Sequence, residues 1–189
     1  NADLIARLRF GEHISDHYWL VADRQVDGKG RQGRAWQSDA GNFTGSAVIN
    51  LAVGDPAAHS LALVAGCAVH ASVVETVGPI DGVSLKWPND LLVSNAKLAG
   101  ILLERHSNVV VIGIGVNLAF APAIECRATQ SLAALGKPIE RNHFAENLAR
   151  QMRHFVTQWR ETGLSAILRY WLDNAHQPGA ELSIQNGEE

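Results

Sequence analysis

Residues 27–34 combine three glycines with the cations Lys29, Arg31 and Arg34 in eight positions. Glycine allows the backbone to approach a ligand closely, and Lys and Arg supply charge and hydrogen-bond donors for an anion. Positions 35–85 contain no Lys or Arg, so the positive charge is concentrated in this segment. The pattern predicts an anion-binding loop, although a surface turn with solvated charges would have the same local composition.

The spacing of Gly28, Gly30 and Gly33 also fits the glycine pattern of dinucleotide-binding folds. That pattern requires a helix opening at the glycines and an acidic residue about 20 positions further on. No apolar stripe at helical spacing follows Gly33, and the acidic residue at a comparable distance, Asp55, precedes a proline as a helix cap does. The sequence therefore disfavours a dinucleotide fold.

A second polar cluster lies at positions 86–90. Alternation places three apolar residues on the predicted core face: Val83, Leu85 and Trp87. Lys86 falls on the opposite face, and Pro88 should end the strand, so that Asn89 and Asp90 stand at its tip. An amide beside a carboxylate can ligate a cation, accept a proton or position an amine. Pro-Asn-Asp is equally ordinary turn chemistry, and both interpretations stay open here.

Two further segments combine polar residues with glycines inside apolar strands. Lys97 precedes a strand that contains Gly100, and Gly113 and Gly115 interrupt a strand rich in Val and Ile just before Asn117. Glycine weakens a strand and leaves space against its backbone, which indicates room for a ligand. The alternatives are a lysine at a solvated hairpin end and a simple bulge.

Hydrophobic periodicity predicts the elements that position these segments. The expected helices are 1–10, a helix capped by Asp55 that ends before Gly78, a helix containing 144–159 that Gly163 ends, and a helix capped by Ser165 that runs through Leu172. The expected strands are 18–22, 44–53 with one buried face, 83–87, 91–93, 98–105, 109–116 and 180–184. Short turns between the middle strands predict an antiparallel meander, hence an α+β fold with a mainly antiparallel central sheet and helices largely on one face.

Composition bounds the class of protein. The 189 residues suit one substantial core, and a net charge of -3 argues against a general nucleic-acid surface. No run approaches the roughly 20 apolar residues of a membrane helix, so we expect a cytoplasmic protein with no membrane partner. The eight histidines show no metal spacing, and we expect Cys67 and Cys126 to be unpaired, with Cys67 buried.

Taken together, segments 28–36, 86–90, 97–104 and 113–117 resemble the catalytic domain of biotin-protein ligases in order and spacing. The resemblance runs from Asn1, which looks like the last residue of the family's Ser-Thr-Asn element, to the final predicted strand. It implies a class II aminoacyl-tRNA synthetase-like fold, with the catalytic domain over 1–178 and the start of a truncated C-terminal SH3-like barrel over 179–189. We expect both ends of the chain to be incomplete.

The resemblance also implies the reaction. Biotin and Mg-ATP would form biotinyl-5'-AMP and pyrophosphate, and the adenylate would then acylate one lysine of a biotin carboxyl carrier protein. Biotin and ATP are thus expected as substrates with Mg²⁺, without a protein metal site. A homodimer paired through sheet edges, with the strand at 109–116 as a candidate, is a further expectation from the family.

Residue roles follow from the same resemblance. The implied catalytic residues are Arg31, Lys97 and Asp90. The implied biotin-binding residues are Asn1, Gln25, Gly28, Lys29, Gly30, Arg31, Lys97, Gly100, Ile101 and Gly115. The implied nucleotide-binding residues are Arg31, Arg34, Trp36, Asn89, Lys97 and Asn117. Lys29 and Gln32 depart from the pattern, because the family often has arginine at both positions.

Two other functions remain compatible with the sequence. A lipoate or octanoate ligase or transferase could use the same fold, although the segment 86–90 resembles the biotin branch. The chain could also be a non-catalytic sensor of biotinyl adenylate, and a helix-turn-helix before Asn1 would favour a repressor role. Binding of biotin against lipoate separates the first alternative from the ligase.

Overall fold

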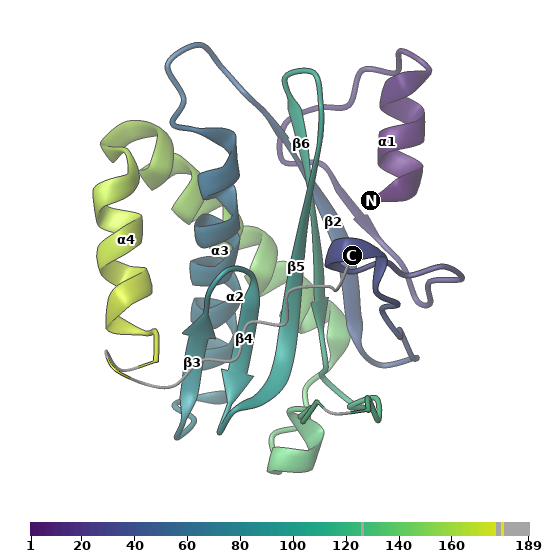
Figure 1. Ribbon diagram of the computed structural model, residues 1–189, viewed down its shortest axis with the longest axis vertical. Coiled ribbons are helices and arrows are strands. Elements are labelled where there is room, and N and C mark those ends of the chain that lie inside the picture. Colours follow the sequence, from purple (N-terminus) through teal and green to yellow (C-terminus); the bar gives the residue numbers. More distant parts are fainter. Residues whose placement is uncertain (126, 177–178, 180–189) are drawn as a thin grey trace.

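The computed structural model describes residues 1–125, 127–176 and 179 (Figure 1). Its α-helices are α1 (Ala2–Arg9), α2 (Leu61–Val77), α3 (Arg141–Thr162) and α4 (Leu164–Asp173). Its strands are β1 (Trp19–Val21), β2 (Phe43–Asn50), β3 (Val83–Lys86), β4 (Asp90–Val93), β5 (Ala96–His106) and β6 (Val109–Val116). Short 3₁₀ turns lie at η1 (Arg31–Gly33), η2 (Ala58–Ser60) and η3 (Ala133–Leu135).

The strands form one sheet in the order β1-β2-β6-β5-β4-β3, and every neighbouring pair is antiparallel. The predicted α+β class and the meander of the last four strands are confirmed. One expectation about assembly is wrong: β6 lies between β2 and β5 and is paired along its length with both, so it offers no free edge to a second copy. Within the described residues the outermost strands are β1 and β3.

Helices α2, α3 and α4 pack together on one face of the sheet (Figure 1). The stripe of α3 is buried as predicted: Phe144, Leu148, Met152, Phe155 and Trp159. Helix α2 contributes most of its residues to the same core. The segment Ala58–Val77 is in fact long and apolar enough to cross a membrane, contrary to the expectation from the sequence, but it is largely buried against protein as a core helix is.

The opposite face of the sheet carries α1 at one end and the cationic loop at the other (Figure 1). Val48 and Val111 pack there with Leu4 and Leu8 of α1 in a second cluster. Strand β2 is therefore buried on both faces, and the prediction of one solvated face is wrong. The residues that alternate with its apolar side chains include the small polar Thr44 and Ser46, and these are buried too.

Several local predictions also need correction. Asp55 does not cap α2, since its carboxylate accepts from the Ala52 N–H in a turn and the helix begins after Ser60. Trp87 is 55% exposed beyond the end of β3 and does not belong to the core. Gly163, and not Ser165, occupies the N-cap of α4. The strand predicted at 180–184 and the thiol of Cys126 lie outside the described residues, whereas Cys67 is buried and free as expected.

Candidate active site

The cationic loop closes on itself by backbone hydrogen bonds. The Gly30 N–H donates to the Arg34 carbonyl at 2.7 Å, and the Trp36 N–H donates to the Gly28 carbonyl at 2.8 Å. A Cβ at Gly28 would lie 2.3 Å from the Trp36 carbonyl oxygen, so this close pairing requires glycine. The loop therefore has a defined shape that presents Arg31 and Arg34 near its tip.

The indole of Trp36 returns from this loop onto the sheet, where β5 and β6 carry facing glycines. Gly100 and Gly115 are register partners, and a Cβ on either would meet the Trp36 ring, at 3.1 Å and 2.2 Å respectively. At Gly113, on the same face of β6, a Cβ would meet the Asn1 side chain at 2.6 Å. The pairings of β6 with β2 and β5 run without a register shift, so the alternative of a bulge is wrong. The side chains of Trp36 and Asn1 occupy the space above these glycines, and its use by a ligand stays a prediction.

Lys97 lies beside this glycine floor. Its residue is 9% exposed, so the alternative of a solvated hairpin end is wrong. Its Nζ lies 2.6 Å from Asp90 Oδ1 and 5.4 Å from the centre of the Trp36 ring. Burial lowers the pKa of the Lys97 ammonium, Asp90 opposes this effect, and the nearby charges of Arg127 and Arg34 lower the pKa further. The ammonium therefore stands where an additional anion would be favourable.

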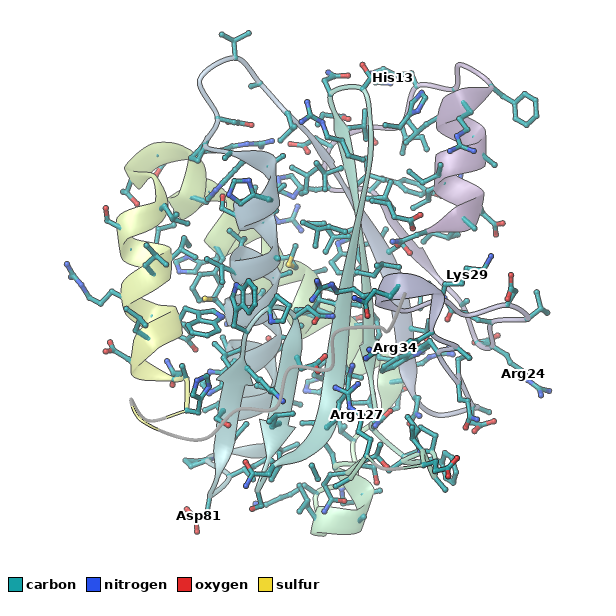
Figure 2. The ribbon with its side chains drawn as sticks, in the orientation of Figure 1. His13, Arg24, Lys29, Arg34, Asp81 and Arg127 are labelled. Carbon is teal, nitrogen blue, oxygen red and sulfur yellow. The ribbon has the colours of Figure 1, made fainter. Side chains whose placement is uncertain are left out.

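Arg127 belongs to this centre, although nothing in the sequence singled it out. Its guanidinium pairs with Asp90 Oδ2, while Lys97 pairs with Oδ1 of the same carboxylate. Lys97, Arg127 and Arg34 thus place three cations near one carboxylate, because the charge of Arg34 also acts on the Lys97 ammonium. Figure 2 shows Arg34 and Arg127 over the same part of the sheet. The excess positive charge suits an anionic ligand.

Asn89 joins the loop to the sheet. Its Nδ2 donates to the Ile101 carbonyl at 2.8 Å, and the Ile101 N–H donates to the Asn89 carbonyl at 2.9 Å. An Nη1 of Arg31 lies 3.4 Å from Asn89 Oδ1, which brings together two residues 58 positions apart. Since the Ile101 N–H is already engaged, only its carbonyl has a lone pair left for a ligand.

Asn117 is buried at the end of β6. Its Nδ2 donates to the carbonyls of Lys97 and Gln130 at 3.3 and 3.1 Å, which fixes the orientation of the amide. Its Oδ1 is buried and has no hydrogen-bond donor among the residues that the structure describes. A buried acceptor of this kind fits a ligand donor or a cation.

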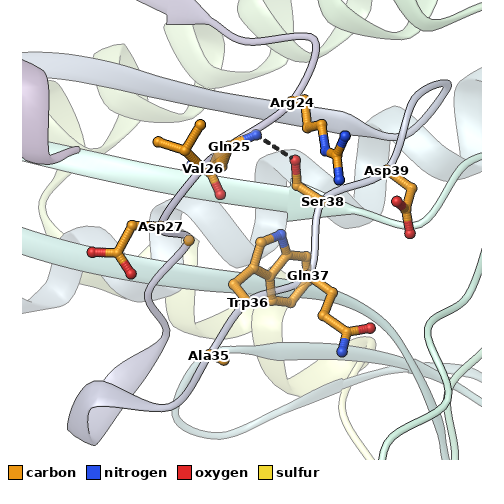
Figure 3. Close-up of a pocket in the computed structure, with 10 residues that line it drawn as sticks. Arg24, Gln25, Val26, Asp27, Ala35, Trp36, Gln37, Ser38 and Asp39 are labelled. Carbon is orange, nitrogen blue, oxygen red and sulfur yellow. Dashed lines mark hydrogen bonds between the residues drawn. The ribbon is translucent and has the colours of Figure 1, made fainter.

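The remaining predicted residues line the outer part of the loop. Gln25 donates its backbone N–H to Ser38 Oγ at 2.8 Å, and the segments 24–28 and 35–39 line a pocket (Figure 3). Lys29 pairs with Asp27 at 3.1 Å on the solvent side, with 63% of its side chain exposed. The Arg34 guanidinium donates to Gln32 Oε1 at 3.1 Å. The structure thus brings Arg34 and Trp36 close to Lys97 and Arg31 to Asn89, while the ammonium of Lys29 pairs with Asp27.

Asn1 lies on the same face of the sheet. Its Oδ1 accepts from Ser46 Oγ at 2.8 Å, and its Nδ2 donates to the Leu102 carbonyl at 3.1 Å. Asn1 is therefore fixed over Gly113, close to the glycine floor. No group of three or more His, Cys, Asp and Glu side chains able to hold a metal ion occurs in the described part of the chain.

Comparison with known proteins accounts for this arrangement. The sequence signature of the Biotin/lipoate A/B protein ligase family matches residues 9–119. The biotin--[acetyl-CoA-carboxylase] ligase of Paracoccus denitrificans is 34% identical over 95% of this chain and 80% of its own length. The chain belongs to the Biotin/lipoate A/B protein ligase family. The predicted family is confirmed.

Two further relatives of this ligase-family chain are informative. The bifunctional ligase/repressor BirA of Escherichia coli is 38% identical over 98% of the chain, which spans 59% of that protein. The structure of the biotin protein ligase from Aquifex aeolicus in complex with biotin and ATP superposes with a TM-score of 0.79 at 26% identity, over 89% of this chain and 73% of that one. The fold is therefore that of biotin protein ligases.

Proposed function

We propose that this chain activates biotin with ATP and transfers it to a lysine of a biotin carboxyl carrier protein. The biotin carboxylate attacks the α-phosphate, giving biotinyl-5'-AMP and releasing pyrophosphate. The carrier lysine amine then attacks the acyl carbon, forms an amide and releases AMP. The observation that supports this function best is the buried Lys97 between a glycine floor and a loop that carries Arg31 and Arg34.

The charge arrangement suits the first step. A carboxylate and a triphosphate repel one another, so the reaction needs cations that hold both and stabilise the charge that develops on phosphorus. Lys97 would bind the biotin carboxylate and then the α-phosphate, while Arg31 and Arg34 would hold the phosphates. Trp36, Asn89 and Asn117 would contact the nucleotide. The closed loop would also exclude water from the acyl adenylate, which water would otherwise hydrolyse.

The predicted biotin-side residues surround the same floor. Gly100, Gly115 and the Ile101 carbonyl would form its base, with Asn1, Gln25, Gly28 and Gly30 around it. Lys29 would act from the loop after leaving Asp27. Asp90 would orient or deprotonate the incoming carrier lysine.

Mg²⁺ would enter with ATP. It prefers oxygen ligands and usually keeps waters and phosphate oxygens, which a mainly cationic site can accept. The buried Asn117 Oδ1, which has no donor in the described structure, is a neutral oxygen that fits such an ion. The metal would neutralise phosphate charge, while Lys97 and Arg31 would act on the reacting groups.

We expect the reaction in the cytoplasm, with a carrier such as the acetyl-CoA carboxylase subunit as partner, and the homodimer stays a prediction.

One experiment tests the function directly. The protein is incubated with ATP, Mg²⁺, labelled pyrophosphate and either biotin or lipoate, and exchange of label into ATP is measured. A carrier domain is then added and its mass is followed. We expect exchange and a carrier mass increase with biotin alone. Lipoate-dependent exchange would favour the lipoate branch, tight adenylate binding without carrier labelling would favour a sensor, and no exchange with either acid would contradict the ligase function.

A further inference from the structure

We propose that Arg127 is a positioning residue that keeps Asp90 paired when Lys97 leaves this carboxylate for the substrate. This inference rests on the proposed function, because it concerns how Lys97 becomes available to the carboxylate and α-phosphate. It assigns a role to a residue outside the four sequence motifs of the family. It also explains why one carboxylate has two cationic partners.

The geometry divides the Asp90 carboxylate between two cations. Oδ1 faces the Lys97 ammonium and Oδ2 faces the Arg127 guanidinium, so neither cation displaces the other. The side chains of Asp90 and Lys97 are each 11% exposed, whereas Arg127 is 31% exposed and can retain contact with water. A simple Lys-Asp pair at this depth would leave the carboxylate stranded as soon as the lysine moved.

Backbone hydrogen bonds hold Arg127 at this position. The Lys97 N–H donates to the Ala128 carbonyl, and the Gln130 N–H donates to the Lys97 carbonyl, both at 2.9 Å. Lys97 also forms a parallel bridge with Thr129. The segment 127–130 is therefore fixed to the backbone of Lys97. Arg127 stays beside Asp90 when only the side chain of Lys97 moves to the substrate.

The cost of leaving the Asp90 carboxylate unpaired can be separated from the long-range effect of the Arg127 charge on the ligand. Biotin binding to Lys97 costs little while Arg127 holds Asp90, but without Arg127 it leaves a buried carboxylate unpaired. Such a loss typically costs about 10 to 100-fold in an equilibrium constant. Replacing Asp90 with asparagine removes the charge that would be stranded, so Arg127 should then matter far less. A purely long-range effect of the Arg127 charge on the ligand would persist in that background.

The first test is a double-mutant cycle on biotin affinity, measured by calorimetry. We expect Arg127→Ala to weaken biotin binding about 10 to 100-fold and Arg127→Lys to recover most of this loss. In the Asp90→Asn background, Arg127→Ala should change affinity less than about threefold. Arg105→Ala removes an exposed arginine outside the site and should leave affinity unchanged. Equal effects of Arg127→Ala in both backgrounds would overturn the proposal.

A second cycle needs no ligand. Lys97→Met mimics the departed lysine, and urea unfolding is measured with and without Arg127→Ala in that background. In the Lys97→Met background, Arg127→Ala should raise the unfolding constant about 10 to 100-fold when Asp90 is present. It should raise the constant less than about threefold when Asp90→Asn is added. Equal changes would overturn the role of Arg127. If the wild-type chain fails to bind biotin, the ligase function fails, while this cycle still decides whether Arg127 holds Asp90.

Discussion

The Trp36 indole occupies the space that a side chain at Gly115 would fill, with 2.2 Å between its Cζ2 atom and an ideal Cβ at that position. A residue of the cationic loop and a residue of the central strand are thus matched in shape, although 79 positions separate them. The absence of a side chain at Gly115 lets Trp36 of the loop pack onto the sheet, and it also leaves the backbone of β6 accessible. The contact also places the ring beside Lys97.

Gly115→Ala tests this match. The added methyl group must displace the Trp36 ring, and such overpacking typically costs about 1 to 3 kcal/mol. We expect biotinyl-adenylate retention to fall about 10 to 100-fold and the Trp36 fluorescence to move toward that of a solvated indole, measured against a Trp36→Phe reference. Gly66→Ala is the matched control, because its nearest neighbour, Leu85, lies at an ordinary 3.4 Å. Unchanged adenylate retention in Gly115→Ala would contradict the role of the contact.

Single-turnover assays should separate the cations of the site. Loss of one positioned charge donor typically slows turnover about 100 to 1,000-fold, and we expect this range for Lys97→Ala and Arg31→Ala in adenylate formation. Lys29→Ala should cost less, under about 10-fold, since its exposed ammonium must first leave Asp27 to reach the substrate. Comparable losses at all three positions would show that the loop rearranges around the substrates. Near-normal rates in the first two variants would remove their assigned roles.

His70 gives the fold a defined pH dependence. It is 5% exposed in α2, its Nδ1 lies 2.9 Å from the Tyr170 hydroxyl, and burial lowers its pKa to about 4. The unfolded chain, with an ordinary histidine pKa of about 6.5, binds the proton more readily. The free energy of unfolding should therefore fall as the pH decreases from about 6.5 to about 4, by roughly 3 kcal/mol from this group. Above about pH 7 its contribution is constant.

The measurement is urea unfolding of the wild type and His70→Gln across that range. We expect the variant to lose stability less steeply as the pH falls. His59→Gln is the control, because it removes an exposed imidazole near the start of the same helix. Parallel curves for wild type and His70→Gln would show that other groups account for the acid sensitivity.

Ser60 satisfies the indole N–H of the fully buried Trp159. The Trp159 Nε1 donates to Ser60 Oγ at 2.8 Å, which links α3 to the start of α2. Ser60→Ala should lower the free energy of unfolding by about 1 to 3 kcal/mol, because it leaves a buried donor without a partner. Ser165→Ala should change it by less than about 0.5 kcal/mol, since Ser165 is exposed and makes no helix cap. Equal effects would contradict this account.

The sequence by itself determined the class of fold and the chemical segments. Periodicity located the buried stripe of α3, and apolar runs between short turns located the strands of the meander. The concentrated cations at 29–34 and the glycines at 100, 113 and 115 indicated an anion site with space above a sheet. Those signals are local, since each depends on residue type and short spacing.

Only the tertiary structure decided which residues meet. The pairing of Gly100 with Gly115, the placement of Trp36 over both and the burial of Lys97 all depend on strand register and loop closure. Arg127 carried no local signal, because a single arginine in an irregular segment has no distinguishing spacing. Its place beside Asp90 depends on the parallel bridge between Lys97 and Thr129, which are far apart in the chain. Local patterns specify elements, whereas a site built from several elements is specified by how they pack.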